Sequence, residues 1–202
     1  MNQEKLKQAL ALIDQANSAD PNTDHADGRA WPKELLYSQR MSDILRRYAP
    51  EADAAQQIAI HAQHIERWKS PRSDYPMNRN GYLQWRTHLY AFHAETVASI
   101  LQGLGSDEQT IERVRQAVGK RAVKRNPDTQ LLEDVAAMTF IEHYMLDFAA
   151  RHPEYDEEKW IDIIRKTWKK MSLGGQQFVL DGGIKLPDSL APLIQKALAQ
   201  ES

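Results

Sequence analysis

Apolar residues recur at intervals of three and four along most of this chain, the spacing that places them on one face of an α-helix. A polar stretch, residues 17–28, interrupts this spacing, and no segment alternates apolar and polar residues as a half-buried strand does. The pattern therefore predicts an all-α protein, a single-domain bundle of about eight helices over residues 1–202.

Proline and capping residues indicate where several of these helices begin. Pro32 suits a first helical position, and Asp156 can cap the helix that follows it. Ser106 with Gln109 has the spacing of a capping box, whereas segment 176–187 has no clear period. The expected helices cover residues 6–16, 33–48, 55–68, 81–104, 107–118, 129–151, 157–171 and a last segment from 187 onward.

Composition narrows the classes of protein to consider. The chain has 26 basic and 28 acidic residues and a formal net charge of −2, so net charge indicates neither a nucleic-acid nor an anionic membrane partner. It has no cysteine, which excludes disulfides and thiolate zinc sites. No run reaches the roughly 20 apolar residues of a membrane-spanning helix. We expect a cytoplasmic protein with no membrane partner, and a homodimer stays open.

Residues 58–95 are unusually rich in chemically versatile side chains. They hold four of the seven histidines and two of the five tryptophans, around a polar, proline-containing loop at residues 69–80. A loop of about a dozen residues is at the length where loops usually carry function. We therefore expect the functional site here.

Three histidines and one aspartate are candidate ligands of a divalent metal ion. His61 and His64 are spaced to share one side of a helix, and His93 lies on the apolar face of the next helix. Asp134 lies on the apolar face of the helix expected at 129–151, where a carboxylate needs a cation or several donors. The metal could be Mn, Fe, Ni, Zn or Mg. The alternative is that the histidines are hydrogen-bonded core residues and the aspartate forms a structural ion pair.

Cationic and aromatic residues next to these candidates favour an anionic ligand. Arg72, Arg79 and Arg86 can grip a phosphate or carboxylate, while Trp85 can stack on a ring. Lys120, in the one dense basic run, could add a further anion contact. Alternatively, the arginines tether the loop and the basic run is a solvated connector.

The order of these motifs resembles a known but uncharacterised family, the domain of unknown function four-two-zero-two. The resemblance is carried by segments 63–86, 92–95 and 132–136 and extends over nearly the whole chain. No activity is assigned to that family, so this resemblance implies none.

More distantly, the helix order is similar to that of the metal-dependent phosphohydrolases named for their His-Asp (HD) doublet. This similarity would place Tyr37 where that superfamily has an early histidine ligand, and His64 in the doublet. It implies that His64, His93 and Asp134 are the catalytic metal set, with His61 or water completing it. The sequence departs from the pattern because the early ligand is a tyrosine and the doublet is not His-Asp.

Three functions are consistent with these observations. The first is a divergent HD-like hydrolase that cleaves a nucleotide or another small phosphate ester. The second is a non-catalytic helical module that binds a nucleotide, a nucleic-acid end or a partner protein. The third is a structural bundle whose histidines are core residues.

Overall fold

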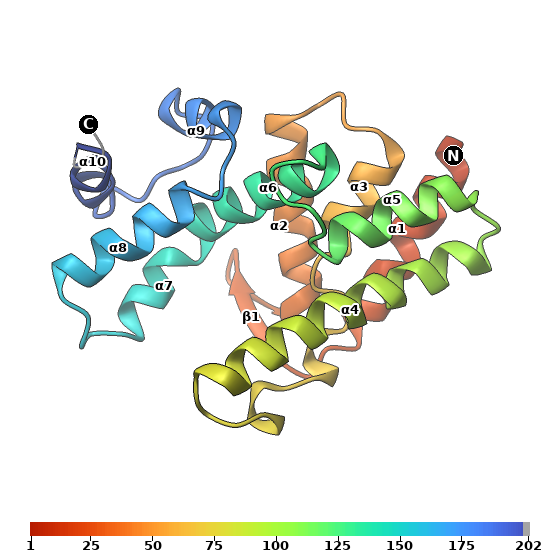
Figure 1. Cartoon of the computed structure of the whole chain (residues 1–202), viewed down its shortest axis with the longest axis horizontal. Coiled ribbons are helices and arrows are strands. Elements are labelled where there is room, and N and C mark those ends of the chain that lie inside the picture. Colours follow the sequence, from red (N-terminus) through yellow and green to blue (C-terminus); the bar gives the residue numbers. More distant parts are fainter. Residues whose placement is uncertain (200–202) are drawn as a thin grey trace. The chain divides into compact units, whose positions relative to one another are not determined.

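The computed structural model describes residues 1–199, and it confirms that the chain is mostly helical (Figure 1). Contacts within the chain group these residues into two compact units, and the boundary along the sequence lies between Leu132 and Glu133. The boundary falls inside one helix, α6 (Pro127–His143), so the single domain expected for residues 1–202 stays a prediction. Residues 200–202 of that range lie outside the described residues.

The first unit contains five helices before α6, a hairpin and two short 3₁₀ turns. Its elements are α1 (Gln3–Ser18), β1 (Thr23–Ala26), β2 (Arg29–Pro32), α2 (Lys33–Tyr48), α3 (Ala54–His61), η1 (Arg67–Lys69), η2 (Arg72–Asp74), α4 (Arg79–Gly103) and α5 (Glu108–Val118).

Side-chain caps define several of these helix starts. The Asp53 carboxylate accepts from the Gln56 backbone N–H, and the Gln56 amide oxygen accepts from the Asp53 backbone, which makes a complete capping box for α3. Asp107 caps α5 by accepting from the Thr110 backbone at 2.8 Å. The expected capping box at Ser106 is therefore wrong by one residue, because the carboxylate next to it takes the role.

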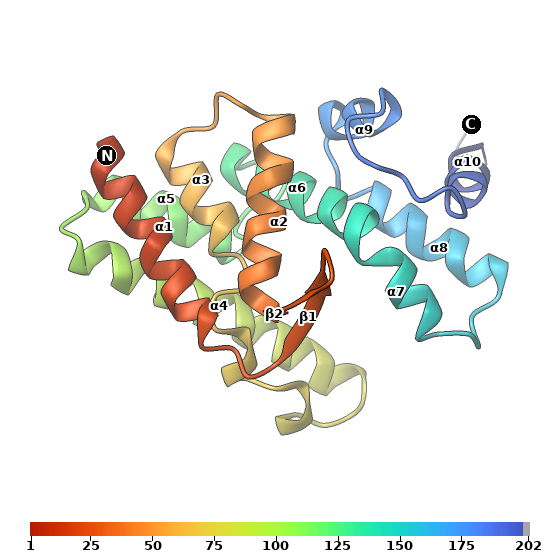
Figure 2. The same cartoon turned by 180° about the vertical axis from the view of Figure 1, so that it is seen from behind.

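The polar stretch before α2 forms an antiparallel hairpin that the sequence pattern did not indicate. Asp27 and Gly28 both have positive φ and join paired residues Ala26 and Arg29, the geometry of a tight Asp-Gly turn. Half of the strand residues are exposed and none is fully buried, so no alternation of apolar residues marks the strands. Figure 2 shows the hairpin beside α2, which both strands contact.

Helices α1 to α5 enclose the core of the first unit. α4 packs along α5 (Figure 1), α5 also packs on α3, and α1, α2 and α3 pack on one another. The large side chains fully buried there include Ile13, Met41, Ile44, Ile58, Ile60, Ile65, Val97 and Leu101. This packing brings the segment after α3, one face of α4 and the end of α5 together.

The second unit contains the rest of α6 and the helices that follow. They are α7 (Met145–Ala150), α8 (Glu157–Trp168), α9 (Leu173–Leu180) and α10 (Ala191–Ala199). Asp156 caps α8 as expected, and α10 packs on α8. α9 was not anticipated, since Gly174 and Gly175 lie inside it rather than ending the preceding helix. Within the described residues, no helix combines the length and apolar character that crossing a membrane requires.

Candidate functional site

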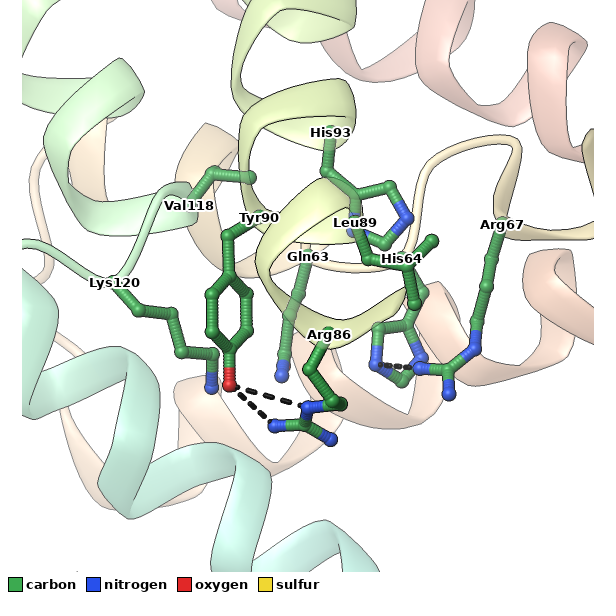
Figure 3. Close-up of a pocket in the computed structure, with 9 residues that line it drawn as sticks. All are labelled: Gln63, His64, Arg67, Arg86, Leu89, Tyr90, His93, Val118 and Lys120. Carbon is green, nitrogen blue, oxygen red and sulfur yellow. Dashed lines mark hydrogen bonds between the residues drawn. The ribbon is translucent and has the colours of Figure 1, made fainter. Parts of the chain in front are cut away.

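The first unit contains a small polar pocket between the turn after α3, the middle of α4 and the end of α5 (Figure 3). Its volume is about 40 Å³. One water needs roughly 10–15 Å³ by this measure, so the pocket has room for a few water-sized groups or one tetrahedral oxyanion. The described residues that line it are Gln63, His64, Arg67, Arg86, Leu89, Tyr90, His93, Val118 and Lys120.

Helical periodicity places three of the polar lining residues together. Arg86, Tyr90 and His93 are four and three residues apart on α4, so they share one face. The Arg86 guanidinium donates to the Tyr90 hydroxyl from Nη2 at 2.6 Å and from Nε at 3.2 Å. Lys120 approaches from the turn after α5, and its side chain extends toward the same pocket in Figure 3.

A buried asparagine fixes the turn that carries the other polar lining residues. Asn17 of α1 donates to the Ser38 hydroxyl of α2 at 2.8 Å and accepts from the Glu66 backbone at 3.0 Å. Glu66 has a left-handed backbone, φ 53°, which turns the chain between His64 and Arg67. The Asn17 side chain therefore joins α1 and α2 to the turn that lines the pocket.

His64 is held between an acid, an aromatic ring and a guanidinium. Its Nδ1 lies 3.3 Å from Glu34 Oε2, its ring stacks on Tyr37 at 4.1 Å, and its Nε2 lies 2.8 Å from Arg67 Nη1. Because a guanidinium only donates, we assign Nε2 as the acceptor and place the ring proton on Nδ1. Burial, followed by the charges of Arg67 and Lys120, holds the pKa of His64 well below its usual range.

Glu34, the acid in contact with His64 Nδ1, is buried. Burial raises the pKa of Glu34 to about 7, although the charges of Arg67 and Lys33 oppose this rise. The carboxyl group is therefore close to half protonated at neutral pH and neutralises the pocket only in part.

His93 carries the one buried side-chain atom of the pocket that lacks a hydrogen-bond partner among the described residues. The residue is 3% exposed, and its Nε2 has no hydrogen-bond partner. A hydrogen bond with the Gln63 backbone opposes the fall in its pKa, as expected when a carbonyl accepts from a ring N–H. Burial, helped by the nearby His64 and Arg67, still lowers the pKa of His93 to about 2. The ring is neutral, and we assign the unpartnered Nε2 as a hydrogen-bond acceptor.

The cationic groups around the two histidines come from three separate segments. Arg67 follows α3, Arg86 lies on α4 and Lys120 follows α5. The Arg67 guanidinium also lies over the Trp85 ring, 5.0 Å from its centroid. Of the described residues that line the pocket, none is acidic. The lining therefore presents an excess of positive charge.

His61, an expected metal ligand, does not line this pocket. Its Nδ1 is 2.8 Å from the Ser42 hydroxyl, and its Nε2 is 2.8 Å from Asp14 Oδ1. These contacts join Asp14 of α1, Ser42 of α2 and His61 of α3. We interpret them as a polar link between the three helices.

Three residues expected to bind substrate, Arg72, Arg79 and Trp85, do not line this pocket. Arg72 donates to the backbone oxygens of Tyr75, Pro76 and Asn78, so it orders the loop from within. The Trp85 indole donates to the Ser70 carbonyl, and its ring makes the cation–π contact with Arg67. Arg79 is exposed and is not among the lining residues.

Asp134 belongs to the second unit, where its carboxylate is hydrogen-bonded at the start of α9. The residue is 2% exposed, and it accepts from the Ser172 backbone at 2.7 Å and from the Ser172 hydroxyl at 2.5 Å. An added Cβ at Gly175 would lie only 3.0 Å from the Asp134 carboxyl carbon. These contacts supply the buried carboxylate with two hydrogen-bond donors. The structural ion pair considered for Asp134 stays a prediction.

The pocket fits a divalent metal ion poorly. Among residues 1–199, no group of three or more His, Cys, Asp or Glu side chains is arranged to hold one. His64 Nε2 already accepts from Arg67, and the surrounding cations would repel a second positive charge. The metal and the catalytic set of His64, His93 and Asp134 stay predictions.

Comparison with known proteins places the chain in a family. Residues 7–194 match a family model described as Domain of unknown function (DUF4202). The chain belongs to the DUF4202 family. This confirms the resemblance seen in its motifs. No curated protein and no solved structure matches this DUF4202 chain, so the similarity to the HD phosphohydrolases stays a prediction.

The sequence analysis did not single out three residues of the site, Glu34, Arg67 and Tyr90. Sequence spacing could have indicated two of these three residues. Arg67 stands three residues after His64, and Tyr90 four after Arg86, both spacings that bring side chains together in a helix or tight turn. No such spacing indicates Glu34, because its contact with His64 joins elements far apart in the chain.

Proposed function

We propose that this protein binds a small phosphorylated ligand and that the pocket of the first unit recognises the phosphate group. The observation that carries the proposal is the convergence of Arg67, Arg86 and Lys120 on a hollow with no acidic lining residue among those described. Arginine offers paired N–H donors to phosphate, and lysine adds a point charge, which together offset the cost of removing an anion from water.

His93 fits a phosphate group as well. A phosphate monoester has its second pKa near 6, so at pH 7 about a tenth of the free ester carries one P–OH group. His93 Nε2 is a buried acceptor without a partner and can accept from that hydroxyl. The pocket volume of about 40 Å³ matches one phosphate group rather than a chain of them.

Thermal unfolding and calorimetry with inorganic phosphate test the proposal. We expect phosphate to raise the Tm of the wild type, because a ligand that binds only the folded state stabilises it. Arg67→Gln and Arg86→Gln should each weaken phosphate binding by roughly tenfold or more, since a hydrogen bond to a charged group contributes about 1.5–3 kcal/mol.

Arg79→Gln is the matched control, because Arg79 is exposed and does not line the pocket. It should bind phosphate like the wild type. The proposal is wrong if phosphate binding is absent, or if Arg79→Gln weakens it as much as Arg86→Gln does.

Metal analysis tests the expected phosphohydrolase separately. In protein purified without a histidine tag, a stoichiometric divalent metal that is lost in His93→Ala would favour that activity over binding alone. We expect no such metal, because of the cationic lining of the pocket.

A further inference from the structure

A second, larger hollow lies next to the phosphate pocket, between α4 and α5. Its volume is about 320 Å³, within the roughly 300–1,000 Å³ usual for small-molecule sites. The described residues that line it are Thr87, Tyr90, Ala91, Ala94, Glu95, Glu112, Arg115, Gln116, Gly119 and Arg121.

Shared and consecutive residues connect the two cavities. Tyr90 lines both of them. At the end of α5, Val118 and Lys120 line the phosphate pocket, while Gly119 and Arg121 line the larger hollow. The Tyr90 hydroxyl accepts from Arg86, which keeps the ring at the boundary between the cavities. A single molecule that extends past Tyr90 can therefore occupy both.

The larger hollow has a wall of small residues and a polar rim. Ala91, Ala94 and Gly119 leave a shallow surface on which a planar ring can lie. The rim holds Arg115, which pairs with Glu95 at 3.1 Å and with Glu112 at 2.9 Å. Carboxylate oxygens accept hydrogen bonds and a guanidinium donates them, so this rim suits a ring that carries both donors and acceptors.

We infer that one ligand spans the two cavities, with its phosphoryl group among Arg67, Arg86 and Lys120 and a polar ring system of nucleoside size against Ala91, Ala94 and Gly119. This inference rests on the proposed function. It narrows the ligand to phosphate monoesters, because the inner pocket has room for one phosphate group.

Calorimetry of the full chain with four probes tests the inference: inorganic phosphate, ribose 5-phosphate, adenosine 5′-monophosphate (AMP) and adenosine 5′-diphosphate. We expect AMP to bind at least tenfold tighter than inorganic phosphate, with ribose 5-phosphate between them. The diphosphate should bind more weakly than AMP.

Ala91→Leu fills the larger hollow without touching the inner pocket. Ala91 is exposed on α4, so the protein should keep its fold and its wild-type Tm. We expect AMP affinity to fall about tenfold in this variant, consistent with roughly 1.4 kcal/mol, while affinity for inorganic phosphate stays unchanged. Gln84→Leu is the control, because Gln84 is also exposed on α4 and lines neither cavity, and it should leave both affinities as in the wild type.

The outcomes separate the two proposals. If the protein binds inorganic phosphate through Arg86 but AMP binds no tighter, or if Ala91→Leu leaves AMP affinity unchanged, the spanning ligand is wrong and the phosphate pocket stands. If neither phosphate nor AMP binds, the proposed function itself is wrong.

Discussion

Lys120 shows how a single residue of the site departs from what folding alone would favour. It has φ 54°, directly after Gly119 at the end of α5, a position where glycine is the usual residue. A side chain in this left-handed conformation costs about 1 kcal/mol. A lysine here makes physical sense when its charge is needed in the pocket.

Lys120→Gly should therefore stabilise the protein while weakening phosphate binding. We expect the free energy of unfolding to rise by up to about 1 kcal/mol, as measured by urea titration, and phosphate affinity to fall. Lys120→Gln keeps the left-handed side chain and removes the charge, so it should lose affinity without gaining stability. A Lys120→Gly variant that binds phosphate like the wild type would contradict the role of this lysine.

The buried histidine and glutamate of the site should give stability opposite dependences on pH. The pKa of His93 is about 2 in the folded protein against 6.5 ordinarily, so the unfolded chain binds more protons below pH 6.5 and stability falls there. The pKa of Glu34 is about 7 against 4.5, so its contribution is full below pH 4.5 and is lost as pH rises toward 7.

Urea titrations at pH 7 and pH 5 separate these two contributions. His93→Gln should reduce the loss of stability on acidification by up to about 2 kcal/mol, at 1.36 kcal/mol per pKa unit. Glu34→Gln should increase that loss, because it removes the group that gains stability as pH falls. Equal pH dependence in the wild type and His93→Gln would show that the ring is not held neutral.

At the scale of elements, the start of α9 depends on the contact between Asp134 and Ser172. The Ser172 hydroxyl donates to the buried carboxylate and also accepts from the Gly175 backbone at 3.1 Å. Ser172→Ala should lower the free energy of unfolding by about 1–3 kcal/mol, since it removes a cap and one donor to a buried charge.

Ser99→Ala is the control, because the Ser99 hydroxyl is exposed and donates only within its own helix, to Glu95. Its effect should stay within about 0.5 kcal/mol. If Ser172→Ala is no more destabilising than Ser99→Ala in denaturant titrations, Asp134 does not depend on this contact.

At the scale of the whole molecule, the described residues of the proposed phosphate site all belong to the first of the two units. Hydrogen exchange with and without inorganic phosphate should therefore show its clearest gain in protection in segments 61–70, 84–94 and 116–122. Binding shifts local opening equilibria where the ligand makes contact. Protection that rises elsewhere while these segments stay unchanged would place the site in another part of the chain.

The helical pattern predicted α1, α2, α4 and α8 because each buries one regular apolar stripe. It did not predict the hairpin, whose strands bury little, or α9, whose two glycines suggest a helix end. It also predicted one helix over 129–151, where the chain breaks at Tyr144 between α6 and α7. Local pattern thus succeeds where burial is regular and fails where exposure or glycine hides the element.

The sequence by itself determined that the chain is helical and that His93, on an apolar helix face, needs a polar partner. It also predicted an anion contact for Arg86 and Lys120. These properties follow from spacing and from the chemistry of each residue type. Only the tertiary structure decided which candidates meet. It grouped His64, His93, Arg86 and Lys120 around one pocket and bonded His61 and Arg72 elsewhere. The physical reason is that these contacts join segments distant along the chain, and their packing leaves no mark on local periodicity.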